Sequence, residues 1–392
     1  MRFLVFLLVV GLAVLGLSIY VHRRSARVFK LERRARIGLG VSLACGVLLL
    51  FGGRMAALPF SDGTREVVAV LGTCIALGTV IAAVFLFHVD ALSALWWGVD
   101  KLRKRPEPES LDALESEPRR KFVQQASAAV IVTGMGSSTY GALFGRHDYE
   151  IETVPIALPG LPRQLDGYTI AQLSDIHFGT FIQDPELRSA EALVRSARPD
   201  AVVLTGDLVD HEPDYAHYVG RLVRRLEPLA RDGVFAIPGN HDHYTGVEEV
   251  LRSLRRGGAT PLVNDARAIA EGHIALLGVD DLWARRQGWG PNLQAAIEAA
   301  PPGVPRILLA HQPVFFEESA AQVQLQLSGH THGGQVTLGY NPAEMVLPHG
   351  WVRGLYEELG SKLYVNRGFG TAGPPVRIGS APEVTKIVLV SV

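Results

Sequence analysis

Residues 201–210 read Ala201-Val202-Val203-Leu204-Thr205-Gly206-Asp207-Leu208-Val209-Asp210, a short apolar run that ends in a turn with two aspartates. A continuous apolar run of this length, bounded by a glycine, predicts a buried β-strand. Similar runs recur in the C-terminal part of the chain, at 168–173, 201–204, 234–237, 273–279, 306–309, 323–327, 362–365 and 384–390. Helical patterns lie between several of them, at 185–197, 215–231 and 246–256. Strands that alternate with helices predict one α/β domain with a buried mixed sheet over residues 150–392.

Polar residues gather directly after five of these strands. The clusters are Asp175-Ile176-His177, Gly206-Asp207-Leu208-Val209-Asp210, Gly239-Asn240-His241-Asp242, Ala310-His311 and Gly329-His330-Thr331-His332. In open α/β sheets, ligands bind beyond the carboxyl ends of the strands. Carboxylate and imidazole groups together suit zinc, iron or manganese better than calcium or magnesium. One metal ion takes three or four protein ligands, so this supply predicts two ions, although each cluster alone is also typical of a turn or a cap.

The ordered set of clusters resembles the calcineurin-like metallophosphoesterase family over about residues 168–392. Three longer strings are similar to its bacterial membrane-anchored branch, namely Gly239-Asn240-His241-Asp242-His243-Tyr244, Gly329-His330-Thr331-His332-Gly333-Gly334-Gln335 and Tyr364-Val365-Asn366-Arg367-Gly368. The resemblance implies a four-layer α/β/β/α sandwich, in which helices flank two sheets. It also implies that phosphate esters are hydrolysed by attack of a hydroxide bridging two divalent metal ions (Mn, Fe or Zn).

The resemblance implies a role for each matching position. One metal ion would bind Asp175, His177 and His332, the other would bind Asn240, His311 and His330, and Asp207 would bridge the two. His241 would face the substrate as a catalytic residue, and Asp210 would hydrogen-bond to it. Two further residues are predicted to bind substrate, namely Arg367 and His243. An arginine guanidinium suits a phosphate, because it can donate two parallel hydrogen bonds to the phosphate oxygens. Arg367 is also typical of a surface salt bridge, and His243 is also typical of a helix cap.

The first 145 residues are predicted to form an all-α membrane region of about four spans. Apolar runs that are long enough to cross a bilayer as helices lie near residues 3–21, 37–60, 67–89 and 123–144, and the last is only weakly apolar. A single run of this kind is also typical of a buried core helix. Three strong runs within the first 100 residues favour the membrane region.

Charge is divided unevenly along the chain, since residues 1–145 contain 17 basic and 10 acidic residues, whereas residues 146–392 contain 21 basic and 29 acidic residues. Most of the basic residues of the first part lie in two expected loops, 22–36 and 100–121. Basic loops stay on the cytoplasmic side, so residues 146–392 are predicted to lie on the outer or periplasmic side of the cell membrane. Arg119 and Arg120 resemble a twin-arginine export signal, and they are equally typical of residues that flank a membrane helix.

These observations predict a membrane-anchored enzyme that hydrolyses phosphodiesters, pyrophosphates or phosphomonoesters, with lipid-linked or envelope substrates and membrane lipids as expected partners. One alternative is a pyrophosphohydrolase of a nucleotide-linked acylated sugar in lipid A synthesis, which would need a cytoplasmic site. Another is a non-enzymatic metal-binding membrane scaffold. Ionisable residues are scarce in the expected spans, which argues against a transporter. The acidic C-terminal part argues against a nucleic-acid partner.

Overall fold

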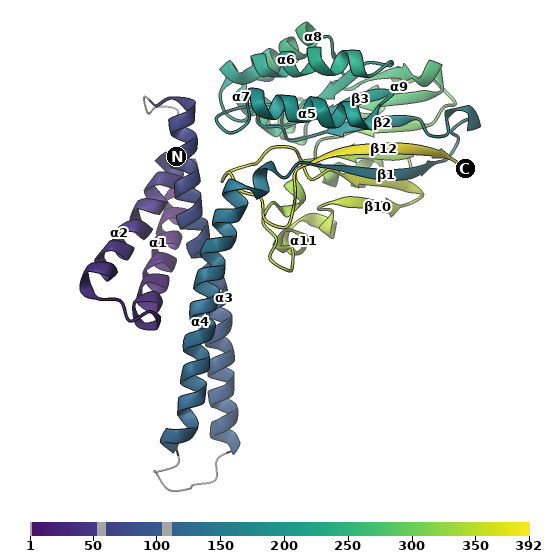
Figure 1. Cartoon of the computed structure of the whole chain (residues 1–392). Coiled ribbons are helices and arrows are strands. Elements are labelled where there is room, and N and C mark those ends of the chain that lie inside the picture. The colour runs from purple at the N-terminus through teal and green to yellow at the C-terminus, as the bar shows by residue number, and fades with distance from the viewer. Residues whose placement is uncertain (1, 53–59, 104–111) are drawn as a thin grey trace. The chain divides into compact units, whose positions relative to one another are not determined.

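The chain divides near residue 145 into a helical unit and an α/β unit (Figure 1). The computed structural model describes residues 2–52, 60–103 and 112–392. The described part of the helical unit consists of α1 (Arg2–Val28), α2 (Arg33–Gly52), α3 (Asp62–Arg103) and α4 (Asp112–Leu143). Each expected apolar run falls mainly on one of these helices.

The helices extend into the segments that were expected to be basic loops. α1 continues to Val28 and α2 begins at Arg33, so residues 29–32 alone connect them instead of 22–36. The expected loop 100–121 is also largely helical where it is described, because α3 reaches Arg103 and α4 begins at Asp112. Residues 104–111 lie outside the described part of the chain. Arg, Lys and Glu are good helix formers, so a helix does not end where its apolar run ends.

Among the described residues, one helical stretch has the length and hydropathy of a membrane span, namely Asp62–Val99 in α3. A core helix of a water-soluble protein or a signal sequence can share these two properties. The expected number of four spans therefore stays a prediction.

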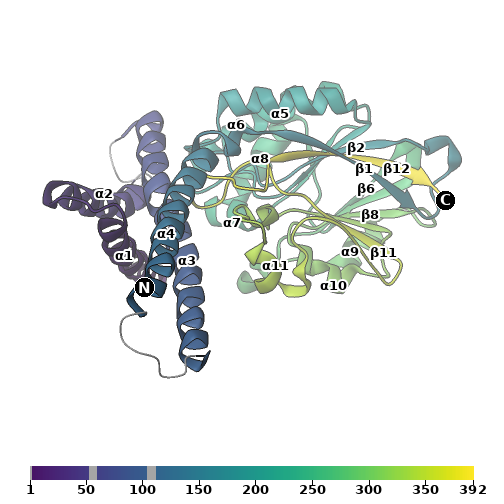
Figure 2. The same ribbon diagram turned by 60° about the horizontal axis from the view of Figure 1, so that its bottom comes forward.

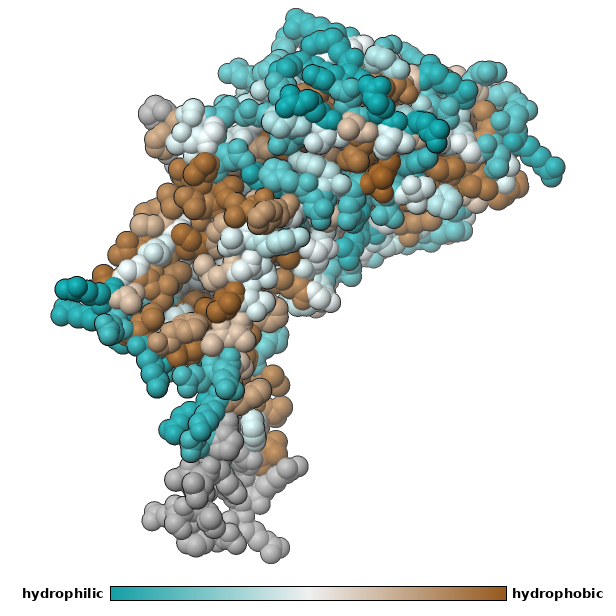
Figure 3. All heavy atoms as spheres, in the orientation of Figure 1, coloured by the Kyte–Doolittle hydropathy of each residue, from teal (hydrophilic) through white to brown (hydrophobic). Residues whose placement is uncertain are grey.

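In the described part of the helical unit, some close helix contacts are made at small residues, and many large apolar side chains are exposed. A side chain at Gly72 of α3 would collide with the backbone of Leu50 in α2, and one at Gly134 of α4 would crowd Ala82 of α3. Large apolar side chains that are more than half exposed include Val9, Leu12, Ile37, Val41, Leu48, Val67, Leu71, Leu92, Leu95 and Trp97. In the view of Figure 3, hydrophobic residues, coloured brown, are gathered over the helical unit. Close contacts at small residues, with large apolar side chains outside, are typical of helices that pack in lipid.

The described α/β unit contains two six-stranded sheets (Figure 2). In spatial order, the first consists of β1 (Glu150–Leu158), β12 (Glu383–Ser391), β2 (Thr169–Leu173), β3 (Ala201–Thr205), β4 (Val234–Ile237) and β5 (Thr260–Pro261). The second consists of β10 (Gly354–Glu358), β11 (Ser361–Val365), β9 (Leu325–Ser328), β8 (Arg306–Leu309), β7 (Ile274–Gly278) and β6 (Asp265–Ile269). The helices are α5 (Asp184–Ala197), α6 (Ala216–Leu226), α7 (Asn240–Thr245), α8 (Val247–Gly257), α9 (Leu293–Ala299), α10 (Phe316–Ser319) and α11 (Pro342–Val346).

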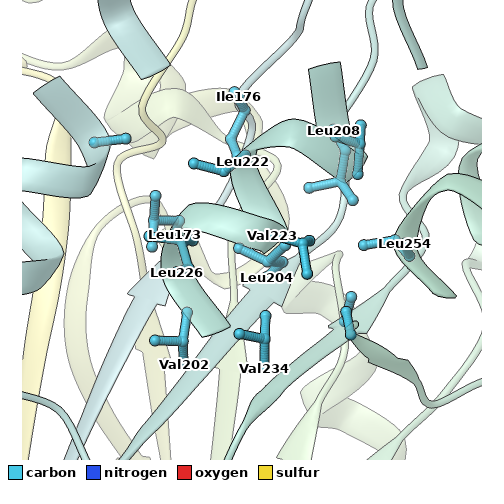
Figure 4. Packing of buried hydrophobic residues seen from close by; sticks show 14 of the residues in the cluster. Leu173, Ile176, Val202, Leu204, Leu208, Leu222, Val223, Leu226, Val234 and Leu254 are labelled. Carbon is cyan, nitrogen blue, oxygen red and sulfur yellow. The ribbon is translucent and has the colours of Figure 1, made fainter. Parts of the chain in front are cut away.

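Side chains along the central strands of the first sheet are buried on both faces. In β3, Val202 and Leu204 belong to the helix-facing core, whereas Ala201 and Val203 belong to the core between the sheets. Successive side chains of a strand point to opposite faces, so a continuous apolar run fills two cores at once. Figure 4 shows the helix-facing core, where Leu222 and Leu226 of α6 are packed with Leu173, Val202, Leu204 and Val234 of the sheet.

Helices cover the outer faces of both sheets. α5, α6 and α8 share a buried cluster with the first sheet, and α9 shares another with β7 and β8 of the second sheet. The apolar faces that remain meet between the sheets. The described α/β unit therefore has the layers helix, sheet, sheet and helix, with mixed sheets.

Two features of this unit differ from the sequence expectations. The strands β1, β5, β6 and β10 were not expected, and all four lie at a sheet edge. Three of them, β1, β6 and β10, carry charged residues that interrupt an apolar pattern, and β5 has only two residues. The helix expected over 215–231 ends at Leu226, and a 3₁₀ turn over Glu227–Leu229 follows. Pro228 in that turn cannot donate the hydrogen bond that would continue the α-helix.

Candidate metal centre

The carboxyl ends of strands from both sheets meet at one site. Asp175 follows β2, Asp207 follows β3 and Asn240 follows β4, and these three strands are parallel neighbours in the first sheet. In the second sheet, His311 follows β8, and His330 and His332 follow β9. Three groups of possible ligand atoms form there among the described residues. The first is Asp175 with His177 and His332, the second is Asp207 with His311 and His330, and a third joins His177 to Asp210 and His241.

The backbone turns sharply at most of these positions. Left-handed φ angles of 51° to 74° occur at Asp175, His177, Asp207, His330 and His332. For residues other than glycine this conformation costs about 1–2 kcal/mol each, so it persists only where the surroundings hold it. Neighbouring glycines make room for the turns, because a side chain at Gly239 would collide with Asp207 and one at Gly329 with Asp175.

The first group is compact and buried. His332 Nε2 lies 3.1 Å from His177 Nε2 and 3.5 Å from Asp175 Oδ1, and the three side chains are at most 5% exposed. Burial, followed by the positive charge of Arg377, lowers the pKa of His332 well below its usual value. His332 is therefore neutral at physiological pH, which is the form that can bind a metal ion.

In the second group, Nε2 of His311 faces the carboxylate of Asp207. His311 Nδ1 lies 2.8 Å from the carbonyl oxygen of Thr205, which can only accept a hydrogen bond, so Nδ1 carries the proton of a neutral ring. In that neutral ring Nε2 directs its lone pair at Asp207 Oδ2, only 3.2 Å away. Burial acts to lower the pKa of His311, but the charge of Asp207 outweighs it and raises this pKa well above its usual value, so either a proton or a metal ion lies between the two atoms. Their arrangement fits a cation held by both.

Asn240 adds an oxygen to this group. Its Oδ1 is buried, and no hydrogen-bond donor reaches it among the residues that the structure describes. Its Nδ2 donates to the Tyr244 hydroxyl at 3.3 Å, so the amide orientation leaves Oδ1 for another ligand. Asp207 Oδ2 also lies 3.8 Å from His177 Nε2 of the first group. One carboxylate thus reaches both groups, and the donor set fits two divalent cations with Asp207 shared between them.

His241 and Asp210 lie beside the two groups. His241 Nδ1 is 3.2 Å from the main-chain oxygen of Asp210 and 3.4 Å from its carboxylate Oδ1. Burial acts to lower the pKa of His241, but Asp210 and the charge of Asp207 outweigh it and raise this pKa to about 9. The same Asp210 oxygen lies 3.0 Å from Nδ1 of His211, a half-exposed residue to which the sequence patterns assign no role.

The structure places the two predicted substrate-binding residues against carboxylates. The Arg367 guanidinium contacts Glu383, and its Nη2 lies 3.2 Å from Glu150 Oε2. His243 Nε2 lies 2.8 Å from Asp280 Oδ1, and both side chains are at most 10% exposed. These contacts support a structural part for both residues, and their substrate role stays a prediction.

Asp242 has a structural part that its position in the sequence could have indicated. Its carboxylate accepts hydrogen bonds from the backbone amides of Gly239, Leu208 and Val209, and the residue is fully buried. An aspartate at the third position of a helix is a known capping signal. Asp242 therefore ties the turn after β3 to the turn after β4 and sets the spacing of Asp207 and Asn240.

Arg377 supports the metal centre through hydrogen bonds to the surrounding loops. No sequence motif indicated this residue. Its side chain is 1% exposed, and its guanidinium donates to the main-chain oxygens of Arg367, Gly368 and Gly370. Its Nη2 lies 3.2 Å from Nδ1 of His332. Arg377 thereby joins the loop after β11 to the loop after β9.

We expect Arg377→Met to lower the free energy of unfolding by about 3 kcal/mol or more, because several buried carbonyl oxygens would lose their donor. Thermal unfolding of the metal-loaded protein in detergent would show this as a drop in Tm of several degrees. Arg353→Met, which removes an exposed guanidinium, is the matched control. Equal Tm values for the two variants would contradict the supporting role of Arg377.

Comparison with known proteins agrees with this geometry. The family model described as calcineurin-like phosphoesterase matches residues 168–334. The metallophosphoesterase YkuE of Bacillus subtilis is 32% identical over 70% of this chain and 98% of the relative. A transmembrane protein with metallophosphoesterase domain from Danio rerio is 34% identical over 79% of this chain and 71% of the relative. The phosphodiesterase YaeI of Escherichia coli is 32% identical over 69% of this chain and 99% of the relative.

The chain belongs to the calcineurin-like phosphoesterase family. It is a metal-dependent hydrolase of phosphoesters.

Proposed function

We propose that this chain hydrolyses phosphodiesters with two divalent cations, and that its helical unit anchors the α/β unit on the outer side of the cytoplasmic membrane. The observation that carries the proposal is the position of Asp207, whose carboxylate reaches His311 of one ligand group and His177 of the other. The name of the relative YaeI, a phosphodiesterase, supports diesters as the substrate class. Pyrophosphates and phosphomonoesters are compatible with the same ligand set.

Two bound cations of manganese, iron or zinc would neutralise phosphate oxygens and make a water molecule acidic enough to attack phosphorus at neutral pH. Asp175, His177 and His332 would hold one cation, Asn240, His311 and His330 the other, and Asp207 both. His241 Nδ1 faces Asp210, so the proton on Nε2 is left for the substrate. His241 donates that proton to the leaving oxygen, and Asp210 holds the charged ring in place.

The surface of the helical unit supports the membrane anchor. Many of its large apolar side chains are exposed while some of its glycines, such as Gly72 and Gly134, make close helix contacts, and the relative from Danio rerio is named as a transmembrane protein. Arg119 and Arg120 lie within α4, and export through a twin-arginine signal would lead to the same side of the membrane. Only six residues connect α4 to β1. A short connection between a membrane helix and the phosphoesterase unit would suit lipid-linked phosphate esters.

Intact spheroplasts of a bacterium that expresses the full chain test the proposal in one experiment. With Mn²⁺ and a charged aryl phosphodiester that does not cross membranes, we expect hydrolysis without lysis, and we expect a membrane-impermeant chelator to stop it. Cells that express Asp207→Asn are the control. Hydrolysis that appears only after lysis would place the site in the cytoplasm and favour a cytoplasmic substrate. No hydrolysis in either state would refute this substrate class.

A further inference from the structure

A row of aromatic rings begins at the metal centre. The His241 ring lies 4.7 Å from the ring of the ligand His177. The His241 ring also stacks with the ring of His211 at 5.6 Å and lies 5.3 Å from the ring of Tyr244. Tyr244 in turn lies 4.9 Å from Trp283. We call His211, His241, Tyr244 and Trp283 the aromatic wall.

The aromatic wall is accessible from solvent. Tyr244 is 52% exposed, the His211 side chain is 53% exposed, and Trp283 is half-buried. The Tyr244 hydroxyl contacts Nδ2 of Asn240, which belongs to the second ligand group. The exposed rings therefore start directly beside the position at which a phosphate would bind.

Buried polar contacts hold Trp283 in place. Its backbone amide donates to Asp281 Oδ1 at 2.7 Å, and both carboxylate oxygens of Asp281 accept from Gln312, the residue after the ligand His311. The Trp283 ring also lies 5.8 Å from that of His243, which is paired with Asp280. Trp283 is thus held in place before a ligand binds, so a ligand would not have to order it.

We propose that the aromatic wall binds a planar aromatic ring, such as a nucleobase, carried by the leaving group of the substrate. The inference rests on the proposed function, because His241 marks the side of the phosphate on which the leaving oxygen lies. Rigid, exposed rings stack favourably on a flat conjugated partner, whereas a saturated chain gains only from buried area. The wall therefore selects phosphate esters by the flatness of the group beside the scissile bond.

Binding to the metal-loaded full chain in detergent tests the proposal without turnover. The probes are hydrolysis-resistant phosphonate analogues of adenosine 5′-monophosphate and of ribose 5-phosphate, which differ only in the base. We expect the adenosine analogue to bind about tenfold more tightly or better, as stacking on aromatic side chains typically provides.

Trp283→Ala should remove this preference and leave the affinity for the ribose analogue unchanged, while Trp283→Phe should retain part of the preference. Trp289→Ala, which removes an exposed Trp nearby in sequence, is the control.

A second pair of probes separates the effect of a planar ring from the effect of hydrophobicity. The 2-phenylethyl and 2-cyclohexylethyl phosphonates have similar size, and we expect the phenyl compound to bind more tightly. Equal affinities for this pair, or for the adenosine and ribose analogues, would overturn the proposal. A Trp283→Ala variant that weakens the adenosine and the ribose analogue alike would also overturn it. Hydrolysis of adenosine 5′-(methyl phosphate) is measured separately. Base-dependent binding without hydrolysis would refute the proposed function and support the binding role of the aromatic wall. Hydrolysis without base-dependent binding would support the proposed function and refute the binding role of the aromatic wall.

Discussion

Asp207→Asn is expected to reduce phosphodiester hydrolysis by about 10³-fold or more and to lower the content of bound metal. Asp207 is buried and its carboxylate lies between the two groups of ligands, 3.2 Å from His311 and 3.8 Å from His177. Its other oxygen accepts the backbone amide of His241 at 2.8 Å. An amide in its place removes the one negative charge that both cations would share, and charge stabilisation by such ions contributes several kcal/mol to the transition state.

The measurement is turnover of an aryl phosphodiester with Mn²⁺, together with metal analysis of the purified variant. Asp200→Asn is a matched control, because Asp200 is partly buried and accepts the backbone amide of Thr169 at 2.8 Å, at the start of β2 and away from the metal centre. We expect this control to keep its activity. Full activity and full metal content in Asp207→Asn would show that Asp207 is not shared between two cations.

His241→Ala is expected to keep both metal ions and to lose about 10²–10⁴-fold in kcat, which is the usual contribution of a positioned acid. The loss should be greatest for substrates with poor alkyl leaving groups, which need a proton, and smaller for aryl leaving groups. His217→Ala, at an exposed histidine on α6, is the control and should leave kcat unchanged. Empty metal sites in His241→Ala would instead identify His241 as a ligand.

The pH profile follows from the raised pKa of His241. A histidine whose pKa is about 9 is protonated at neutral pH and can act as an acid, and it loses the proton as the pH rises through that value. Bound cations repel the charged ring, so the basic limb of kcat should lie at or below about pH 9. We expect His241→Ala to lose this limb, and a limb that persists in the variant would assign it to another group.

The strand ends of the α/β unit could be predicted because they depend on local sequence. A short apolar run marks a buried strand, and the residues after it are polar, as around Asp207 and Asn240. Edge strands such as β10 were missed because their side chains alternate irregularly and include charged residues. The helical segments of the N-terminal unit could also be predicted, but their ends could not, because residues such as Arg, Lys and Glu continue a helix beyond its apolar run.

The residue types at each strand end are given in the amino-acid sequence, and they already indicate that carboxylates, imidazoles and an amide are available for two cations. Which of these groups lie together depends on the tertiary fold. The orientation of His311 depends on the carbonyl of Thr205, the charge near His332 comes from Arg377, and Arg367 is turned toward glutamates of β1 and β12. Each of these contacts joins segments far apart in the chain. Such contacts follow from sheet order and register, which are set by packing of whole layers and leave no local pattern in the sequence.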